Sequence, residues 1–229
     1  MQAIILVAGI GKRLNEITKG LPKCLTKVGD KTFLRRMIDQ LKDKGVKNII
    51  IVTGHEAELI KQASPEAIHI HNELYEKSNN IISVLQTKQE VLGQDFLILY
   101  GDIIFDSGIL LDCINSEESC MAISEPFAGD TEKIKTDGDY VKDIGNHIVK
   151  HNGNFIGISK IKAEDSVDFF EWMEFILPES KDCYYTKALK KMISNGHQIE
   201  AIMANGRYWA EMDYPEDYEK IKRRLTSVE

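Results

Sequence analysis

The sequence has little of what holds small secreted or metal-stabilised folds together. Its 229 residues include only four cysteines (Cys24, Cys113, Cys120 and Cys183), and no two form a Cys-x-x-Cys pair. We therefore expect neither a disulfide framework nor a structural zinc site. Reduced thiols are the ordinary state in the cytoplasm, which is the expected location. A chain of this length can bury a core without cross-links.

Long apolar runs are also missing. The longest ones, such as Ile49–Val52 and Ile103–Phe105, extend over a few residues, whereas a membrane-spanning helix needs about 20. Met1–Val7 runs directly into an apolar, strand-like segment, so we expect no secretory signal. These absences predict a soluble protein with no membrane partner.

Positive charge is in deficit. The chain has 29 Lys and Arg against 36 Asp and Glu, a net charge of −7. Proteins that bind nucleic acid usually carry a positive face, so we expect no nucleic acid partner. Hydrophobic residues (43%) and charged residues (28%) are present in the proportions of ordinary globular proteins.

The first half of the chain alternates strand-like and helix-like segments. Apolar strand candidates lie at Ala3–Val7, Ile49–Val52 and Phe96–Tyr100, and apolar positions recur at helical spacing over Phe33–Leu41. Ile49–Val52 is continuously apolar, as in a strand that is covered on both faces. The pattern predicts a parallel or mixed sheet in an α/β layer fold.

The second half is less regular. Asp137–Gly138 is placed like the turn of a hairpin, helices are expected over Val167–Ile176 and Thr186–Asn195, and Pro215 suits the first turn of a last helix. We find no repeat and no linker rich in Pro, Gly or Ser. We therefore expect a single domain over residues 1–229, with the later hairpin and helices as a cap over the sheet.

A glycine-rich basic turn, Gly9–Leu14, follows the first strand candidate. It does not fit the dinucleotide fingerprint, because Leu14 stands where a third Gly is needed, and it lacks the spacing of a P-loop. Glycines at the carboxyl end of a buried strand nevertheless let backbone N–H groups approach a phosphate. Lys12 and Arg13 in an acidic protein favour a polyanionic ligand, although a solvated basic turn has the same composition.

Longer motifs resemble the nucleotidyltransferase family that makes nucleotide sugars and related activated phosphates. Leu6–Leu14 followed by Leu21–Lys23 is similar to the family's L-A-A-G-x-G-x-R-L…P-K signature, with Val7 for the usual Ala. Ile51–His55, Leu99–Asp102 and Trp209–Asp213 resemble its second strand and its two acidic segments.

The resemblance implies an α/β, Rossmann-like three-layer sandwich with a mixed, mostly parallel sheet and a small cap. It also implies a nucleotide-binding part at about 1–125, an acceptor-binding cap at about 126–205 and a metal-bearing segment at 206–229.

The implied reaction is the transfer of a nucleoside monophosphate from a nucleoside triphosphate to an acceptor phosphate. Two anionic groups must meet, so cations and a divalent metal are needed rather than an activated nucleophile. Arg13 and Lys23 are the expected catalytic cations, and Asp102 and Asp213 the expected Mg²⁺ ligands. On spacing alone, either aspartate is equally well explained as a turn or helix-cap residue. The expected nucleotide-binding residues are Leu6, Ala8, Gly9, Gly11, Lys12, Arg13, Lys23, Gly54, Asn80, Ser83 and Gly101.

One stretch bears on the acceptor. Asn72–Val84, with its Asn79–Asn80 pair, resembles the branch that uses CTP to activate phosphocholine and aminoalkyl phosphonates. This resemblance implies CTP and a small phosphorylated or phosphonate alkanolamine (phosphocholine, phosphoethanolamine or 2-aminoethylphosphonate) as substrates. Asn146 and Asn154 depart from the pattern of the family, where Lys and Glu are usual.

The sequence leaves the recognition of that acceptor open. A quaternary ammonium needs an aromatic cage, for which Tyr184, Tyr185 and Trp209 are candidates, with Glu211 beside the metal. A primary amine needs a carboxylate, for which Asp130, Glu132 and Asp182 are candidates. A sugar-1-phosphate or polyol-phosphate nucleotidyltransferase and a non-catalytic nucleotide-binding protein are the alternatives. A monomer and a homodimer both fit the sequence.

Overall fold

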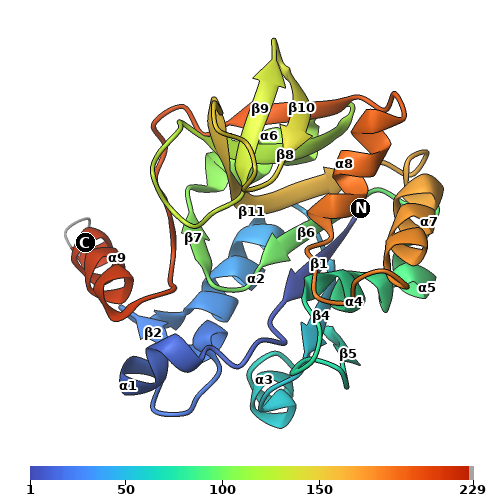
Figure 1. Ribbon diagram of the computed structural model, residues 1–229. Coiled ribbons are helices and arrows are strands. Elements are labelled where there is room, and N and C mark those ends of the chain that lie inside the picture. The colour runs from blue at the N-terminus through green and yellow to red at the C-terminus, as the bar shows by residue number, and fades with distance from the viewer. Residues whose placement is uncertain (227–229) are drawn as a thin grey trace.

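The computed structural model describes residues 1–226, and its centre is a twisted mixed sheet (Figure 1). The strand order is β5-β4-β1-β6-β11-β8-β12-β10-β9. β1 (Gln2–Leu6) lies parallel to β4 (Asn48–Thr53) and to β6 (Phe96–Tyr100), and β4 lies parallel to β5 (Ile68–His71). The carboxyl ends of these four strands therefore meet at one edge.

Antiparallel pairing enters with β11 (Gly153–Ile161), which lies between β6 and β8 (Ser119–Ser124). β12 (Ile199–Met203) is parallel to β8, and the hairpin of β9 (Lys133–Asp137) and β10 (Tyr140–Ile144) continues the sheet. β9 also pairs with β11, which folds the hairpin back over the middle of the sheet. The turn lies at Gly138–Asp139, one residue beyond the predicted Asp137–Gly138, because Asp137 still pairs with Tyr140 as the last residue of β9. Gly138 has φ +56°.

Two apolar cores cover the two faces of the sheet. β1 sends Ile4 into one core and Ala3 and Ile5 into the other, because successive strand residues point to opposite faces. The Ile4 core packs under helices α4 (Asn80–Leu85), α5 (Lys88–Val91), α7 (Ser166–Ile176) and α8 (Thr186–Ser194). The other core packs under α2 (Phe33–Asp43), α3 (Ala57–Ala63) and α6 (Ser107–Asn115). This is the expected three-layer α/β sandwich.

A third, smaller cluster joins the C-terminal segment to the N-terminal one. α9 (Pro215–Thr226) buries Ile221 against Leu14, Ile104 and Met212. Beneath it lie β7 (Ile103–Phe105), β13 (Trp209–Glu211) and the hairpin of β2 (Lys27–Val28) and β3 (Lys31–Thr32). Short turns complete this region: η1 (Lys12–Leu14), α1 (Asn15–Thr18) and η2 (Lys23–Leu25).

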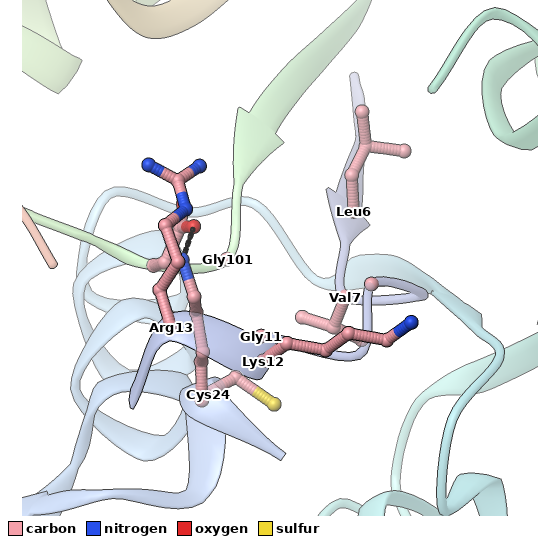
Figure 2. Close-up of a pocket in the computed structure, with 10 residues that line it drawn as sticks. Leu6, Val7, Gly11, Lys12, Arg13, Cys24 and Gly101 are labelled. Carbon is pink, nitrogen blue, oxygen red and sulfur yellow. Dashed lines mark hydrogen bonds and ion pairs between the residues drawn. The ribbon is translucent and has the colours of Figure 1, made fainter. Parts of the chain in front are cut away.

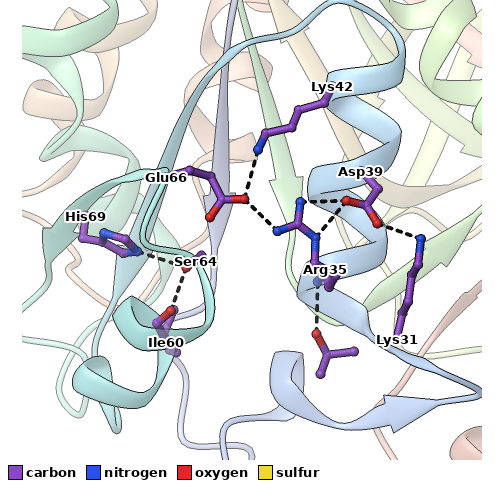
Figure 3. Close-up of polar contacts among 9 residues, drawn as sticks. Lys31, Arg35, Asp39, Lys42, Ile60, Ser64, Glu66 and His69 are labelled. Atoms are coloured by element: carbon purple, nitrogen blue, oxygen red, sulfur yellow. Dashed lines mark hydrogen bonds and ion pairs between the residues drawn. The ribbon is translucent and has the colours of Figure 1, made fainter.

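An ion-pair network ties α2 to the segment before β5 (Figure 3). The Arg35 guanidinium contacts Asp39 at 2.7 Å and Glu66 at 2.7 Å, and Lys42 reaches the same Glu66 oxygen at 3.0 Å. A backbone N–H and these two cations lower the pKa of Glu66 to about 2. Every cation here has a carboxylate partner, so the network serves the fold rather than a ligand. Within residues 1–226, none of the helices combines the length and the apolar character that crossing a membrane requires.

Candidate functional site

The glycine-rich turn after β1 is fixed where three parallel strands end. The N–H of Val7 donates to the Val52 carbonyl of β4 at 3.0 Å, and the N–H of Gly101, after β6, donates to the Leu6 carbonyl at 3.0 Å. A Cβ on Gly101 would overlap the Val7 side chain, so the close approach of these ends requires glycine. The loop is thereby held at the edge where α/β sheets bind ligands.

Gly11 makes room for a lysine. It has φ +66°, and an added Cβ would lie 2.6 Å from Cγ of Lys23. Pro22, at φ −53°, opens the turn η2 that carries Lys23 back across the loop. Figure 2 shows the Lys12 and Arg13 side chains leaving the loop in different directions. A cavity of about 250 Å³ adjoins these residues, lined by Leu6, Val7, Gly9, Gly11, Lys12, Arg13, Lys23, Cys24, Gly101 and Asp102.

A two-stranded ribbon brings two distant aspartates together. β7 and β13 pair antiparallel with Glu211 opposite Ile103, and the N–H of Met212 donates to the Asp102 carbonyl at 2.9 Å. Asp102 precedes β7 and Asp213 follows β13, so this register places both carboxylates at the same end of the ribbon. The sequence analysis expected no strand at β7 or β13, because three-residue strands carry too short a pattern to identify.

Lys23 lies between these two carboxylates. Its Nζ is 2.7 Å from Asp213 Oδ1 and 3.3 Å from Asp102 Oδ2, and Arg13 approaches Asp213 at 3.7 Å. Burial lowers the pKa of Lys23, but the two aspartates raise it more, so the ammonium stays charged. Burial raises the pKa of Asp102, Lys23 lowers it and Asp213 raises it, with a net rise. Neither carboxylate is used as a helix cap.

The same residues fit a divalent cation. Asp102, Glu211 and Asp213 each offer an oxygen, and the three oxygens lie within 4.8 Å of one another. Burial, Asp102 and Asp213 together raise the pKa of Glu211 to about 8, because three carboxyl groups share the site with few cations. Carboxylate oxygens are the ligands that hard cations such as Mg²⁺ prefer. We call Lys23, Asp102, Glu211 and Asp213, with the loop Gly9–Arg13, the transfer site.

A second cavity, of about 320 Å³, opens beside the transfer site. Asn80 joins its walls: its Nδ2 donates to the Tyr100 hydroxyl at 3.1 Å, and its Oδ1 accepts from the Tyr185 N–H at 2.8 Å. Asn79 accepts from the N–H of Asn80 at the start of α4. Asn79 is therefore the N-cap of the helix, and Asn80 connects the cavity walls. The lining residues are Leu6, Ala8, Gly9, Arg13, Lys23, Asn72, Tyr75, Ser78, Asn79, Asn80, Ser83, Tyr100, Asp102, Tyr184, Glu211 and Asp213.

Two of the residues expected to bind the acceptor lie elsewhere. Tyr185 is fully buried, and its hydroxyl is 2.7 Å from that of Ser159. Trp209 packs against Phe127, with ring centroids 5.8 Å apart, and does not line the cavity. Tyr184 and Glu211 do line it. Gly54 lies under the loop, where an added Cβ would meet the Ala8 carbonyl at 2.5 Å, so its place is structural.

The sequence analysis did not name Tyr100, Asn72 and Tyr75 as individual site residues, although they lie in segments that carry the resemblance and they line the second cavity. Tyr100 ends β6 just before Gly101–Asp102, and its position at a strand end was the available signal. Asn72 donates to Ser83 Oγ at 3.0 Å, which is a contact between residues on opposite sides of a loop. Spacing along the chain does not reveal such a contact.

Comparisons with known proteins agree with this geometry. Residues 3–126, more than half of the chain, match the family model described as the MobA-like NTP transferase domain. A bifunctional IPC transferase and DIPP synthase of Aquifex aeolicus is 31% identical over 233 residues, covering 99% of this chain and 52% of the relative. A CTP:phosphoglutamine cytidylyltransferase of Campylobacter jejuni is 28% identical over 249 residues, covering 96% of this chain and 98% of the relative. The chain thus spans about half of the first relative and nearly all of the second.

A solved structure supports the fold. The inositol-1-phosphate CTP transferase of T. maritima superposes with a TM-score of 0.84 at 20% identity, over 97% of this chain and 95% of that one. The loop, the lysine and the acidic cluster thus occur in a chain whose N-terminal half matches a transferase model and whose fold is that of a nucleotide transferase. The chain belongs to the nucleotidyltransferase family with a MobA-like NTP transferase domain.

Proposed function

We propose that this protein transfers CMP from CTP to a small phosphorylated or phosphonate alkanolamine and releases pyrophosphate. One observation carries the proposal: the Lys23 ammonium lies 2.7 and 3.3 Å from the carboxylates of Asp213 and Asp102, at the mouth of a glycine loop. An acidic protein that gathers a cation, a carboxylate cluster and a glycine loop at one sheet edge is suited to reactions between phosphates.

The reaction joins two anions. An oxygen of the acceptor phosphate attacks the α-phosphorus of CTP, the bond from that phosphorus to the β-phosphate bridging oxygen breaks, and pyrophosphate leaves. Arg13 stands beside the loop, its guanidinium 5.0 Å from the Tyr214 ring centre, and is placed to neutralise the triphosphate. Lys23 is placed to bind the α-phosphate and the acceptor phosphate. Such charge stabilisation is worth about 10²–10³ in rate per contact.

The acidic cluster supplies the metal side of this chemistry. Asp102 and Asp213, with Glu211 next to them, are the residues that would hold Mg²⁺. A bound Mg²⁺ would neutralise phosphate charge and align the two substrates. The Lys23 ammonium contacts both aspartates, so it would compensate part of their charge beside such a cation.

Two features support CTP and an alkanolamine. The Asn79–Asn80 pair, on which the resemblance to that branch rests, lies in the wall of the cavity beside the transfer site. The Campylobacter relative named above is a CTP-dependent enzyme and covers nearly the full length. The cap at about 126–205 would provide the acceptor side. Cys24, Cys113, Cys120 and Cys183 are free thiols, which fits the proposed cytoplasmic location.

Pyrophosphate release tests the proposal. CTP, UTP, GTP and ATP should each be combined with phosphocholine, phosphoethanolamine, 2-aminoethylphosphonate, glucose-1-phosphate and inositol-1-phosphate in the presence of Mg²⁺. We expect release with CTP and an amine-bearing acceptor. Release with a sugar or polyol phosphate instead would favour a sugar-1-phosphate or polyol-phosphate nucleotidyltransferase. The inositol-1-phosphate CTP transferase of T. maritima is an enzyme of that kind. If CTP binds in a calorimeter and no acceptor reacts, the protein is a nucleotide-binding protein.

A further inference from the structure

A third cavity adjoins the transfer site on the side of the β9–β10 hairpin. It measures about 340 Å³ and lies between Glu132, which precedes β9, the β10 end at Ile144, and the start of α8. We call it the side pocket. Tyr184 lines both the side pocket and the 320 Å³ cavity, so its ring stands between the acidic cluster and Glu132.

Glu132 has no cation partner in the described chain. Both of its carboxylate oxygens lie 2.8 Å from Thr186 Oγ1, a single hydroxyl that has one proton to donate. Among residues 1–226, no ion pair within 4.0 Å includes Glu132, although Lys190 in the same pocket contacts Asp143 at 2.7 Å. A half-buried carboxylate with one neutral donor is costly to keep charged. Burial accordingly raises the pKa of Glu132 to about 7.

The same carboxylate is close to the transfer site. Burial raises the pKa of Tyr100 well above its ordinary value, and the carboxyl groups of Glu132 and Glu211 raise it further. Burial also raises the pKa of Tyr184, with Glu132, Glu211 and Asp213 adding to the rise. The hydroxyls of Tyr100 and Tyr184 thus interact electrostatically both with the Glu132 carboxyl group and with carboxyl groups of the acidic cluster. A small molecule with a phosphate at one end and a cation at the other matches this arrangement.

Within the side pocket, the aromatic groups do not form a cage, because Tyr75 and Tyr100 line the 320 Å³ cavity instead. Tyr185 is buried with its hydroxyl bonded to Ser159, and Trp209 is packed against Phe127. Tyr184 is then the one aromatic residue of the described chain that lines the side pocket. A quaternary ammonium has no N–H to donate and depends on several aromatic faces. A primary ammonium donates to a carboxylate through charge-assisted hydrogen bonds.

We propose that Glu132 is the specificity-determining residue that accepts hydrogen bonds from a primary ammonium group of the acceptor. This inference rests on the proposed function and deepens it: the acceptor is an aminoalkyl phosphate or phosphonate, and phosphocholine is a poor substitute. Thr186 holds the carboxylate in place, and the acceptor phosphate extends past Tyr184 toward Lys23.

Steady-state kinetics of Glu132→Gln test the role of the carboxylate. The amide keeps the size of the side chain and a bond to Thr186 but removes the charge. We expect the KM for phosphoethanolamine or 2-aminoethylphosphonate to rise about 10- to 100-fold, the range of a charge-assisted hydrogen bond. The kcat and the KM for CTP should change by less than about threefold, because the transfer site is intact. Glu171→Gln, an exposed carboxylate on α7, is the matched control.

Three acceptors sharpen the result: phosphoethanolamine, phosphocholine, and ethyl phosphate, which lacks the nitrogen. The wild type should prefer phosphoethanolamine to both others, and Glu132→Gln should abolish that preference. Equal use of ethyl phosphate, a preference for phosphocholine, or a larger effect of Asp182→Asn than of Glu132→Gln would overturn the inference while leaving nucleotidyl transfer intact. Calorimetric binding of phosphoethanolamine to both proteins gives a readout without turnover. Equal affinities would overturn the inference, and absence of turnover with every acceptor would instead overturn the proposed function.

Discussion

The transfer site takes its residues from the ends of neighbouring strands, whereas the side pocket takes its residues from a hairpin and a helix start that meet only in the folded chain. In the transfer site, backbone hydrogen bonds between Leu6 and Gly101 and between Asp102 and Met212 fix the geometry. In the side pocket, side-chain contacts join the segments: Thr186 donates to Glu132, and Lys190 of α8 contacts Asp143 of β10, each across about fifty residues of sequence.

The difference teaches where the function of this fold is constant and where it varies. Groups that are fixed by sheet register can carry a reaction that every member of the family needs. Groups that are fixed by side chains on connecting segments change without disturbing the sheet. We therefore expect changes in the transfer site to abolish turnover and changes in the side pocket to alter the choice of acceptor.

The largest effect is expected from Asp102→Asn. The amide keeps the shape but removes one of the two charges between which Lys23 lies. Turnover should fall by about 10³ or more, since a metal ligand and a charge partner are lost together. Pyrophosphate release measures the rate, and circular dichroism checks the fold. Asp43→Asn, an exposed carboxylate at the end of α2, should keep full activity. Retained turnover in Asp102→Asn would refute the assignment of the acidic cluster.

Lys23→Met should have the next largest effect, and it separates two roles of the lysine. Turnover should fall by about 10²–10³ because a phosphate-binding cation is lost. Without the ammonium, Asp102 loses its cation partner and Asp213 keeps only Arg13 at 3.7 Å, which destabilises the protein by about 1–3 kcal/mol. Added Mg²⁺ should then raise the melting temperature of Lys23→Met more than that of the wild type, because the cation replaces the ammonium. A Mg²⁺ shift that is the same in the variant, the wild type and an exposed-lysine control, Lys47→Met, would contradict this.

A smaller effect is expected on stability from Glu132→Gln, and its sign depends on pH. Burial raises the pKa of Glu132 from 4.5 to about 7, so the folded protein holds this proton more tightly than the unfolded chain. The stabilisation is complete below about pH 4.5 and is lost as the pH rises through about 7. The glutamine does not titrate, so the free energy of unfolding of the variant should rise by up to about 3 kcal/mol relative to that of the wild type between about pH 5 and about pH 8. Urea unfolding of both proteins at both pH values measures this difference.

That result would also test the contrast between the two regions. A carboxylate that destabilises the free protein at neutral pH is consistent with a residue kept for binding. If the stability difference does not change with pH, Glu132 is ionised without cost and the side pocket already contains its counter-charge.

The sequence predicted the sheet and the transfer site far better than the acceptor side. Strand ends carry their signal locally, so Gly101–Asp102 after an apolar strand and the glycine loop after another were visible as continuous motifs. The structure places Asp102 and Asp213 together through the three-residue strands β7 and β13, and that pairing had no periodic signal. The proximity of the aspartates was therefore expected only from the family resemblance.

The acceptor side was hard to predict for a different reason. Tyr184 and Tyr185 are adjacent, and the sequence gives no means of telling which ring faces the cavity. The outcome depends on the backbone at the start of α8, where Tyr185 turns into the core. Likewise, Asp130, Glu132 and Asp182 were equal candidates for binding an amine. The structure distinguishes Glu132 by its burial against Thr186, which is a tertiary contact that sequence spacing does not reveal.

The smallest effects are expected from substitutions of Tyr184. They discriminate between a carboxylate and an aromatic cage as the group that binds the acceptor's ammonium. Tyr184 is 43% exposed and lies between the two cavities. If a primary ammonium binds Glu132, Tyr184→Phe should change the KM for phosphoethanolamine by less than about twofold, and Tyr184→Ala by about threefold, because the ring contributes mainly shape. If a cage binds a quaternary ammonium, Tyr184→Ala should instead raise the KM for phosphocholine tenfold or more while Tyr184→Phe is silent. Kinetics of both variants with both acceptors decide the question. If the carboxylate binds a primary ammonium, the acceptor KM depends on Glu132 and little on Tyr184. If an aromatic cage binds a quaternary ammonium, the acceptor KM depends on the Tyr184 ring.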